Sequence, residues 1–423
     1  MTVMTVPPGE SAPARRAEFR SLHDGLAAIG GDQAGGWTRF AWTPQDRAAR
    51  EWFTREAEAS GMGVETDRNG NLWATWPGGD ASGERQAGPS AVGTGSHLDT
   101  VRNGGAYDGA LGVICGLLAV RRLQQRRLRP RLRVQVAAFA DEEGGRFGLA
   151  TFGSRLATGV LQPEYARDFR DAQDVPLIEA VAPFGVDPGP DPDRLARLAA
   201  YVEVHVEQGR GLVDLDAPVG VATGIWPHGR WRLRLTGEGN HAGTTRLADR
   251  RDPTLPLAVA IQAARRLATG EGGVATVGRI TLEPNGTNSI PAAATGWLDA
   301  RAADEGALAR MVAEWTSEVR RAATEHGVDA DVVSESLTPA VSFDRELADR
   351  LAGVLGAGGL PAPRLATAAG HDAGALAASV PTGMLFVRNP TGASHTPAEY
   401  ASDEDCLTVV EVLADVLEEL ACR

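Results

Sequence analysis

The sequence is poor in cysteine, in long apolar runs and in net positive charge, and each shortage excludes a class of protein. Three cysteines in 423 residues, Cys115, Cys406 and Cys422, are too few and too scattered for a disulfide framework or a cysteine metal site. The longest apolar stretch, near residues 110–120, is too short and too interrupted by glycine to span a bilayer. A net charge of −13 argues against nucleic acid or an anionic membrane as the main partner.

The N-terminal segment, MTVMTVPPGESAPARR, lacks the apolar core of a signal peptide. We therefore expect a cytoplasmic protein with no membrane partner. Its 43% hydrophobic and 23% charged residues are typical of a globular chain, and 423 residues exceed what one ordinary core organises. Two domains are expected.

Strands and helices alternate through the first half of the chain. Periodicity predicts, in order, a helix over 44–60, a hairpin over 64–76 turning at Asn69-Gly70, a strand ending at Ser96, a helix over 110–125, and strands over 131–140 and 201–206. Polar residues follow several of these strands. This order predicts an α/β fold with an open, mostly parallel sheet that binds its ligand at the carboxyl ends of the strands.

The pattern changes after residue 223. Between residues 224 and 335 the expected elements follow the order βαββαβ, which is that of a compact ferredoxin-like domain. Further helices and a strand follow to the C-terminus. The sequence therefore predicts a discontinuous catalytic domain, residues 1–223 and 336–423, with an inserted lid and dimerisation domain of residues 224–335.

The run from Gly95 to Ala110, GSHLDTVRNGGAYDGA, carries the first chemical signal. It places His97, Asp99 and Asp108 among glycines, which let the backbone approach a bound ion closely. Imidazole and carboxylate together suit Zn²⁺, Mn²⁺ and similar divalent ions. The alternative for this run alone is a polar loop whose His and Asp cap a helix.

Histidines and carboxylates that could bind a divalent metal ion recur later in the chain. The five elements that offer metal ligands are His97, Asp108, Glu142-Glu143, His205 and His395. All but Asp108 lie at or just past the end of an expected strand, and Asp108 follows His97 in one loop. A carboxylate is the side chain best suited to bind two adjacent ions at once. Asp108 is the candidate for this role because its glycine neighbours leave it accessible. Two such ions, about 3.5–4 Å apart, can bind an attacking water and polarise the carbonyl under attack.

The Glu142-Glu143 pair offers two carboxylates with different tasks. One coordinates metal, and its neighbour takes a proton from the attacking water and delivers it to the leaving nitrogen. A solvated acidic surface is the alternative, but the pair directly follows an apolar strand and precedes two glycines. Asp99 is expected to orient His97 rather than to bind metal, because ligating imidazoles usually donate their other N–H to a carboxylate or carbonyl.

Taken together, the sequence resembles the M20-type metallo-amidohydrolases, in the branch of N-carbamoyl-L-amino acid hydrolases, β-ureidopropionases and allantoate amidohydrolases. The motifs that carry the resemblance, in order from about residue 45 to the end, are GSHLDT, GGAYDGALGV, DEEGGRFG, HVEQG, NHAGTT, NSIP, GHDA and ASHTPAEY. The resemblance implies two divalent ions (Zn, Mn, Co or Ni). It assigns Asp108 as the bridging ligand, Glu143 and His395 to one ion, His97 and His205 to the other, and Glu142 as general base and acid.

The HVEQG motif points to the branch that cleaves ureido groups, because related peptidases and deacylases tend to use an acidic ligand there. The implied reaction is hydrolysis of the carbamoyl C–N bond of a small carboxylate, with release of ammonia and CO₂. Gln208 would then contact the ureido group, with an ordinary surface side chain as the alternative. Competing hypotheses are an aminoacylase or dipeptidase using the same site, and a non-catalytic metal-binding or assembly protein.

The inserted domain supplies further residues that only the resemblance identifies. His241 would donate a hydrogen bond to the developing oxyanion, and Arg301 would grip a substrate carboxylate that Asn288 also binds. The family usually pairs these domains in a homodimer and lends this His across it, so whether His241 acts in cis or in trans stays open. The sequence also leaves open the roles of His371, Asp372, Arg388, Asn389 and the cluster Arg246, Arg250 and Arg251.

Overall fold

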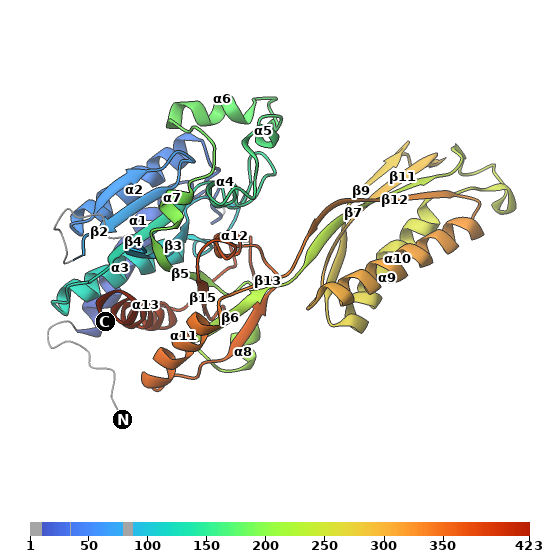
Figure 1. Ribbon diagram of the computed structural model, residues 1–423. Coiled ribbons are helices and arrows are strands. Elements are labelled where there is room, and N and C mark those ends of the chain that lie inside the picture. The colour runs from blue at the N-terminus through green and yellow to red at the C-terminus, as the bar shows by residue number, and fades with distance from the viewer. Residues whose placement is uncertain (1–10, 34, 79–87) are drawn as a thin grey trace. The chain divides into compact units, whose positions relative to one another are not determined.

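The computed structural model describes residues 11–33, 35–78 and 88–423, so most of the N-terminal segment discussed above lies outside it. The chain divides into two compact units (Figure 1). The first comprises residues 1–223, 342–365 and 370–423, and the second comprises residues 224–341 and 366–369.

The first unit is built on a mixed sheet with parallel strands at its centre. Its strand order is β1-β2-β4-β3-β5-β15-β6-β13, and β14 also pairs with β6. The strands are β1 (Gly63–Thr66), β2 (Leu72–Trp76), β3 (Ala91–His97), β4 (Arg133–Phe139), β5 (Leu198–Val206), β6 (Val219–Ile225), β13 (Val341–Ser342), β14 (Arg364–Thr367) and β15 (Thr382–Val387). Neighbours among β4, β3, β5 and β15 run parallel, and the pairs β1-β2, β2-β4 and β15-β6 are antiparallel. The expected largely parallel sheet is confirmed at the centre, where the site residues lie.

Helices cover the faces of this sheet. Helix α3 (Ala110–Gln125) is buried on nearly all sides, as expected of an apolar helix held between β3, β5 and α13 (Asp403–Leu417). Helix α2 (Pro44–Ala59) begins where the Thr43 hydroxyl accepts a hydrogen bond from the Asp46 amide, and Ser402 caps α13 in the same way. The remaining helices of this unit are α1 (Ala12–Ala27), α4 (Phe152–Ala157), α5 (Pro163–Ala166), α6 (Leu177–Val181), α7 (Pro192–Leu195), α8 (Gly211–Asp214), α11 (Arg345–Ala357) and α12 (Asp372–Leu376).

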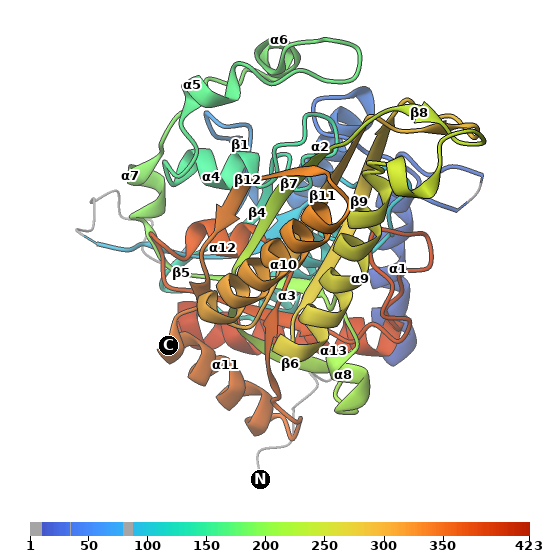
Figure 2. The ribbon, with the colours of Figure 1, turned by 90° about the vertical axis from the view of Figure 1, so that its right-hand side faces the viewer.

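The second unit is a four-stranded antiparallel sheet with two helices on one face (Figure 2). Its strands lie in the order β12-β7-β11-β9, which is the ferredoxin-like arrangement that the βαββαβ pattern predicts. The elements are β7 (His228–Thr236), α9 (Thr254–Glu271), β9 (Val274–Glu283), β11 (Ala293–Arg301), α10 (Glu305–Glu325) and β12 (Asp329–Thr338). A short pair, β8 (Asn240–His241) with β10 (Ser289–Ile290), extends beyond one end of the sheet.

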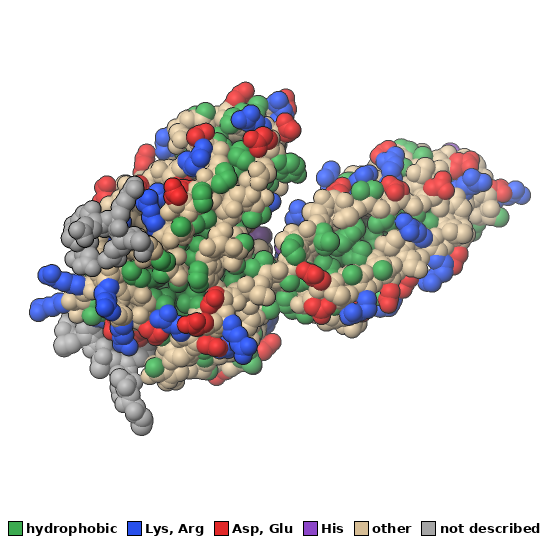
Figure 3. Space-filling view, viewed as in Figure 1, with side chains coloured by type: hydrophobic (Ala, Val, Ile, Leu, Met, Phe, Trp, Pro, Cys, Tyr) green, Lys and Arg blue, Asp and Glu red, His purple; other side chains and the backbone are tan. Residues whose placement is uncertain are grey.

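Two surface properties bear on the choice of partner. No helix among the described residues is long and apolar enough to cross a membrane. On the face drawn in Figure 3, acidic and basic side chains are interspersed over much of the surface.

Candidate metal centre and active site

The candidate site lies at the carboxyl edge of the four parallel strands. His97 is the last residue of β3, and His205 is the last but one of β5. Glu142 and Glu143 follow β4 closely, and His395 lies in the loop after β15. The parallel sheet therefore brings together residues that lie nearly 300 positions apart in the sequence, as the strand-end pattern predicts.

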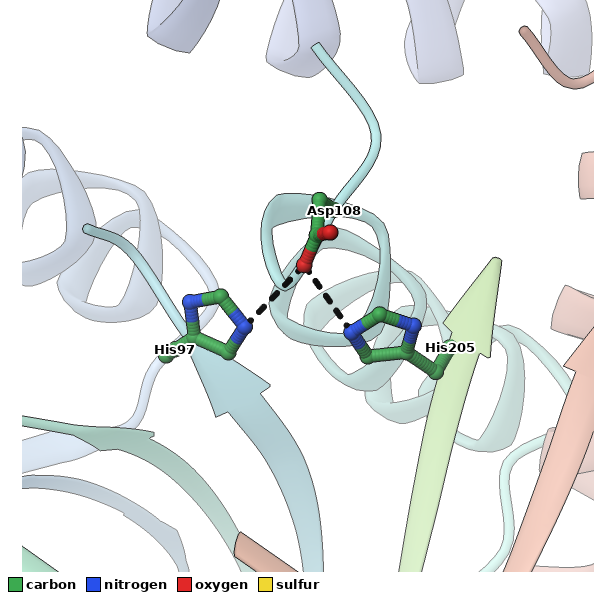
Figure 4. A group of neighbouring side chains, drawn as sticks. All are labelled: His97, Asp108 and His205. Atoms are coloured by element: carbon green, nitrogen blue, oxygen red, sulfur yellow. Dashed lines mark ion pairs between the residues drawn. The ribbon is translucent and has the colours of Figure 1, made fainter. Parts of the chain in front are cut away.

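One group of ligand atoms joins His97, Asp108 and His205 (Figure 4). The Oδ1 atom of Asp108 lies 3.3 Å from His97 Nε2 and 3.1 Å from His205 Nε2. All three side chains are buried. Gly109, at φ +63°, lies against the His97 ring, where an added Cβ would approach within 2.4 Å of the ring atoms. Only glycine lets Asp108 and the imidazole meet at this point.

A second group joins Asp108, Glu143 and His395. The Nε2 atom of His395 lies 3.5 Å from Asp108 Oδ2 and 3.4 Å from Glu143 Oε2. The two oxygens of Asp108 thus face different groups, which is the geometry of a carboxylate that bridges two ions. The side chain of His395 is 49% exposed, whereas Asp108 and Glu143 have nearly buried side chains.

The donor set fits two divalent cations. Among the described residues, the buried atoms His97 Nε2 and Glu143 Oε1 make no hydrogen bond. Burial raises the pKa of the Glu143 carboxyl well above its ordinary value, and the charge of Asp108 raises it further. Burial alone would lower the pKa of His205, but the facing Asp108 carboxylate outweighs it and raises that pKa to about 9. Buried carboxylates crowded in this way are stabilised by a cation that they share.

Glu142 lies beside the first group without belonging to either. Its Oε2 is 3.8 Å from His97 Nε2, and its side chain is 9% exposed. Burial raises the pKa of the Glu142 carboxyl well above its usual range, although the nearby His97 opposes this shift. A carboxyl with a raised pKa is suited to accept and return a proton near neutral pH.

A third group of potential ligands comprises Glu203, His205 and His371. The carboxylate of this group already has hydrogen-bond donors, because Glu203 accepts hydrogen bonds from Ser96 Oγ at 2.7 Å and from the Ala373 amide at 2.8 Å. This group is therefore a hydrogen-bonded support behind His205 rather than a third metal site.

Comparisons with known proteins agree with this geometry. Residues 93–419 match the family described as Peptidase family M20/M25/M40. The chain belongs to this family. It is 36% identical over 413 residues to an N-carbamoyl-L-amino acid amidohydrolase of Geobacillus stearothermophilus, covering 94% of this chain and 96% of the relative. It is 31% identical over 401 residues to an allantoate amidohydrolase of Escherichia coli strain K12, with 94% and 96% coverage.

Solved structures show the same relationship. A hydantoinase/carbamoylase family amidase from Burkholderia multivorans superposes with a TM-score of 0.85 at 30% identity, covering 97% of this chain and 98% of that one. The similarity therefore extends over both units of the M20 chain, and it includes the inserted domain.

In this M20 chain, Gln208 contacts Asp108, the residue shared by the two ligand groups. Its Nε2 donates to Asp108 Oδ2 at 2.9 Å and to Ser394 Oγ at 2.9 Å. Among the described residues its buried Oε1 has no hydrogen-bond partner. That oxygen is therefore a hydrogen-bond acceptor available beside the two ligand groups.

The residues expected from the inserted domain lie at two ends of its sheet. His241 and Asn288 lie in the extension formed by β8 and β10, where the Ala242 amide donates to the Asn288 carbonyl at 3.0 Å. Arg301 ends β11 at the opposite end of the sheet, and its Nε bonds Asp299 at 3.1 Å. At about 3.4 Å per residue, Arg301 and Asn288 are roughly 30 Å or more apart. Within one chain, these two side chains cannot contact the same small carboxylate.

Several residues that the sequence left undecided have defined surroundings. His371 is buried with its ring centre 4.4 Å from that of His205, and its side chain makes no capping hydrogen bond to α12. Asp372 accepts a hydrogen bond from Ser154 Oγ at 2.6 Å. Arg388 makes a two-point contact with Asp405 at 3.0 Å in each bond, which anchors the start of α13.

The arginine cluster near His241 is engaged locally. Arg250 donates to the carbonyls of Ala242 and Thr245, and Arg246 pairs with Asp249. Arg250 thereby stabilises the loop that carries His241. These contacts give Arg246 and Arg250 local structural partners.

Three further buried residues hold the site together. Sequence reasoning missed Asn71 and Glu399 and left the role of Asn389 open. Each bonds to the backbone of a ligand-bearing segment. The position of Glu399, four residues after His395 in the ASHTPAEY motif, was the available signal for one of them. The other two lie in turns whose long-range contacts have no local sequence pattern.

Proposed function

We propose that this protein hydrolyses the carbamoyl C–N bond of an N-carbamoyl-L-amino acid or allantoate-type substrate. One substrate R–NH–CO–NH₂ and one water give R–NH₂, CO₂ and NH₃. The observation that carries this proposal is the position of Asp108, whose two oxygens face two separate ligand groups with Glu142 alongside. Similarity to the named carbamoyl and allantoate amidohydrolases over nearly the whole chain supports the choice of substrate class.

His97 and His205 would hold one divalent ion, Glu143 and His395 the other, and Asp108 both. When bound, such ions polarise the carbonyl under attack and lower the pKa of water. Zn, Mn, Co and Ni all suit these ligands.

Glu142 handles the proton. Its carboxylate accepts a proton from the attacking water and delivers it to the leaving nitrogen, which departs as an amine or ammonia. Burial of Glu142 favours the protonated form that this delivery needs. Gln208, through its unpartnered Oε1, would accept a hydrogen bond from a ureido N–H.

His241, Asn288 and Arg301 would contact the substrate from inserted domains. Because Asn288 and Arg301 lie at opposite ends of one sheet, we propose that one site takes Arg301 from one protomer and His241 with Asn288 from its partner. This arrangement requires a homodimer. Mixing two inactive variants, His241→Ala and Arg301→Ala, would then restore up to a quarter of the activity in hybrid dimers, as a statistical mixture of subunits predicts.

A substrate panel tests the proposal. Metal-loaded protein is incubated with allantoate, N-carbamoyl-β-alanine and several N-carbamoyl-L-amino acids, and ammonia is measured. N-acetyl amino acids and dipeptides form the comparison, with free amino acid as the readout. Ammonia release from ureido substrates alone supports the proposal. Preferential cleavage of the N-acyl or dipeptide set would show an aminoacylase or dipeptidase, and no hydrolysis of either set would favour a non-catalytic protein.

A further inference from the structure

The loop that carries His395, residues 389–399, is attached at both ends to other ligand-bearing segments. We call it the His395 loop. At its far end, Glu399 reaches the loop of Asp108, and at its near end Asn389 reaches the segment after His205. His395 lies between these attachments at φ +58°, in the left-handed region that a non-glycine residue rarely adopts.

Glu399 attaches the loop to the backbone of the bridging residue. Its Oε1 accepts hydrogen bonds from the amides of Tyr107 at 3.1 Å and Asp108 at 2.8 Å. The residue is only 4% exposed. At Gly105, an added Cβ would lie 2.2 Å from the same oxygen, so the Asp108 loop is closed tightly around this carboxylate. Hydrogen bonds from two consecutive amides to one carboxylate fix the backbone from which Asp108 projects.

Asn389 attaches the other end of the loop. Its Nδ2 donates to the carbonyl of Glu207 at 3.1 Å and to that of Ala393 at 2.7 Å. Its Oδ1 accepts from Thr391 Oγ1 at 2.8 Å and from the Gly392 amide at 3.1 Å. The side chain is fully buried. These bonds set the turn that leads into Ser394 and His395.

From these contacts we infer that Glu399 and Asn389 are positioning residues with separable effects on the two ions of the proposed metal centre. Glu399 fixes Asp108, which belongs to both ligand groups. Asn389 bonds mainly within the His395 loop. The segment after His205 that it also contacts is held independently by the Glu207 amide, which donates to the Val387 carbonyl at 2.8 Å, so His205 should keep its place without Asn389. Loss of Glu399 is therefore expected to weaken both ions, and loss of Asn389 only the ion that His395 holds. The inference rests on the metal centre of the proposed function.

Metal binding itself is the readout. Wild-type protein, Glu399→Ala, Glu399→Gln and Asn389→Ala are stripped of metal and titrated with Co²⁺, with stoichiometry and affinity from calorimetry and from the visible spectrum of the bound ion. Glu404→Gln, an exposed acid at the start of α13, is the matched control. Thermal unfolding of each metal-free variant shows whether it is folded.

For Asn389→Ala we expect one ion bound with wild-type affinity and the other weakened about 10- to 100-fold, the range typical when a partner of a metal ligand is removed. For Glu399→Ala we expect both affinities to fall. Glu399→Gln keeps an oxygen for the two amides and is expected to fall between wild type and Glu399→Ala. It also provides the test if the alanine variant does not fold.

The outcomes separate this inference from the proposed function. Wild-type protein that binds no Co²⁺ would overturn the metal centre and this inference together. Wild-type protein that binds two ions, with unchanged affinities in both alanine variants, would overturn this inference alone. Equal loss of both ions in Asn389→Ala would also contradict it, because the two effects would not be separable.

Discussion

Asp99 accepts a hydrogen bond from the backbone amide of Glu142 at 3.1 Å through Oδ1. Its other oxygen, Oδ2, accepts from the Glu143 amide at 3.0 Å, and its backbone carbonyl lies 3.0 Å from His97 Nδ1. The sequence suggests that the carboxylate orients His97, but the carbonyl is the nearer group, since Oδ1 is 3.6 Å from that ring nitrogen. The carboxylate instead fixes the backbone of the residue proposed as general base.

The first prediction concerns Asp99→Asn. The amide keeps one acceptor but turns an N–H₂ group towards one of the two backbone amides, so one hydrogen bond becomes a repulsion between donors. We expect kcat to fall about 10- to 100-fold with little change in bound metal. Steady-state kinetics and metal analysis check this, with the exposed Asp214→Asn as control. A normal kcat would show that the two amides need no acceptor.

The second prediction concerns Glu142→Gln. The amide occupies the same volume but cannot accept and return a proton, so kcat should fall about 10²- to 10⁴-fold, the usual contribution of general acid–base catalysis. Metal content should be retained, because Glu142 belongs to neither ligand group. The exposed Glu164→Gln should behave as wild type. Near-normal turnover in the metal-loaded variant would remove Glu142 from the mechanism.

The third prediction concerns removal of metal. Chelation should abolish ammonia release, and Mn²⁺, Zn²⁺, Co²⁺ or Ni²⁺ should restore it. It should also lower the melting temperature, because the buried Asp108, Glu142 and Glu143 then repel one another. A ligand at 100 times its Kd stabilises the folded state by about 2.7 kcal/mol. Scanning calorimetry with and without chelator measures the shift, and hydrolysis by protein shown to be metal-free would contradict this prediction.

The metal groups were predictable because their residues obey a local rule. The expected strands that end near residues 96, 140 and 206 each end in or lead directly to a ligand, and parallel strands bring their carboxyl ends to one edge. His97, Glu143 and His205 therefore meet whatever the length of chain between them. Asp108 needed only the glycines on either side of it as a further signal. The ferredoxin-like order of the inserted domain could also be predicted, because the spacing of apolar residues distinguishes its strands from its helices.

Other features could not be read from the sequence because they depend on contacts between distant segments. Asn288 and Arg301 are thirteen positions apart, and a shared ligand was a natural expectation. The extended strand β11 between them places them at opposite ends of the sheet instead. The sequence left the role of His371 open, because its burial beside His205 is a contact between distant segments of the chain. The helix α1 was not predicted, although its buried residues Phe19, Leu22 and Leu26 recur at helical spacing.

Asn71 also makes contacts with distant segments that no sequence pattern reveals. The last prediction concerns this residue. It is fully buried in the turn between β1 and β2. Its Oδ1 accepts from the amide of Ala140, two residues before Glu142, and its Nδ2 donates to Asp67 Oδ2 and to the Gly153 carbonyl. The turn thus supports the segment that carries Glu142, the proposed general base and acid, from a distance of about seventy residues in sequence.

We expect Asn71→Ala to lower the free energy of unfolding by about 2–4 kcal/mol, since it leaves a buried amide and a buried carbonyl without partners. Asn71→Asp should be at least as destabilising at neutral pH, because it replaces the donor to Asp67 with a second carboxylate. Urea unfolding of the metal-free protein measures both, with the exposed Gln173→Ala as control. If Asn71→Ala unfolds at the same urea concentration as Gln173→Ala, the segment before Glu142 is held by the β4 ladder alone, and the turn has no part in positioning the acid.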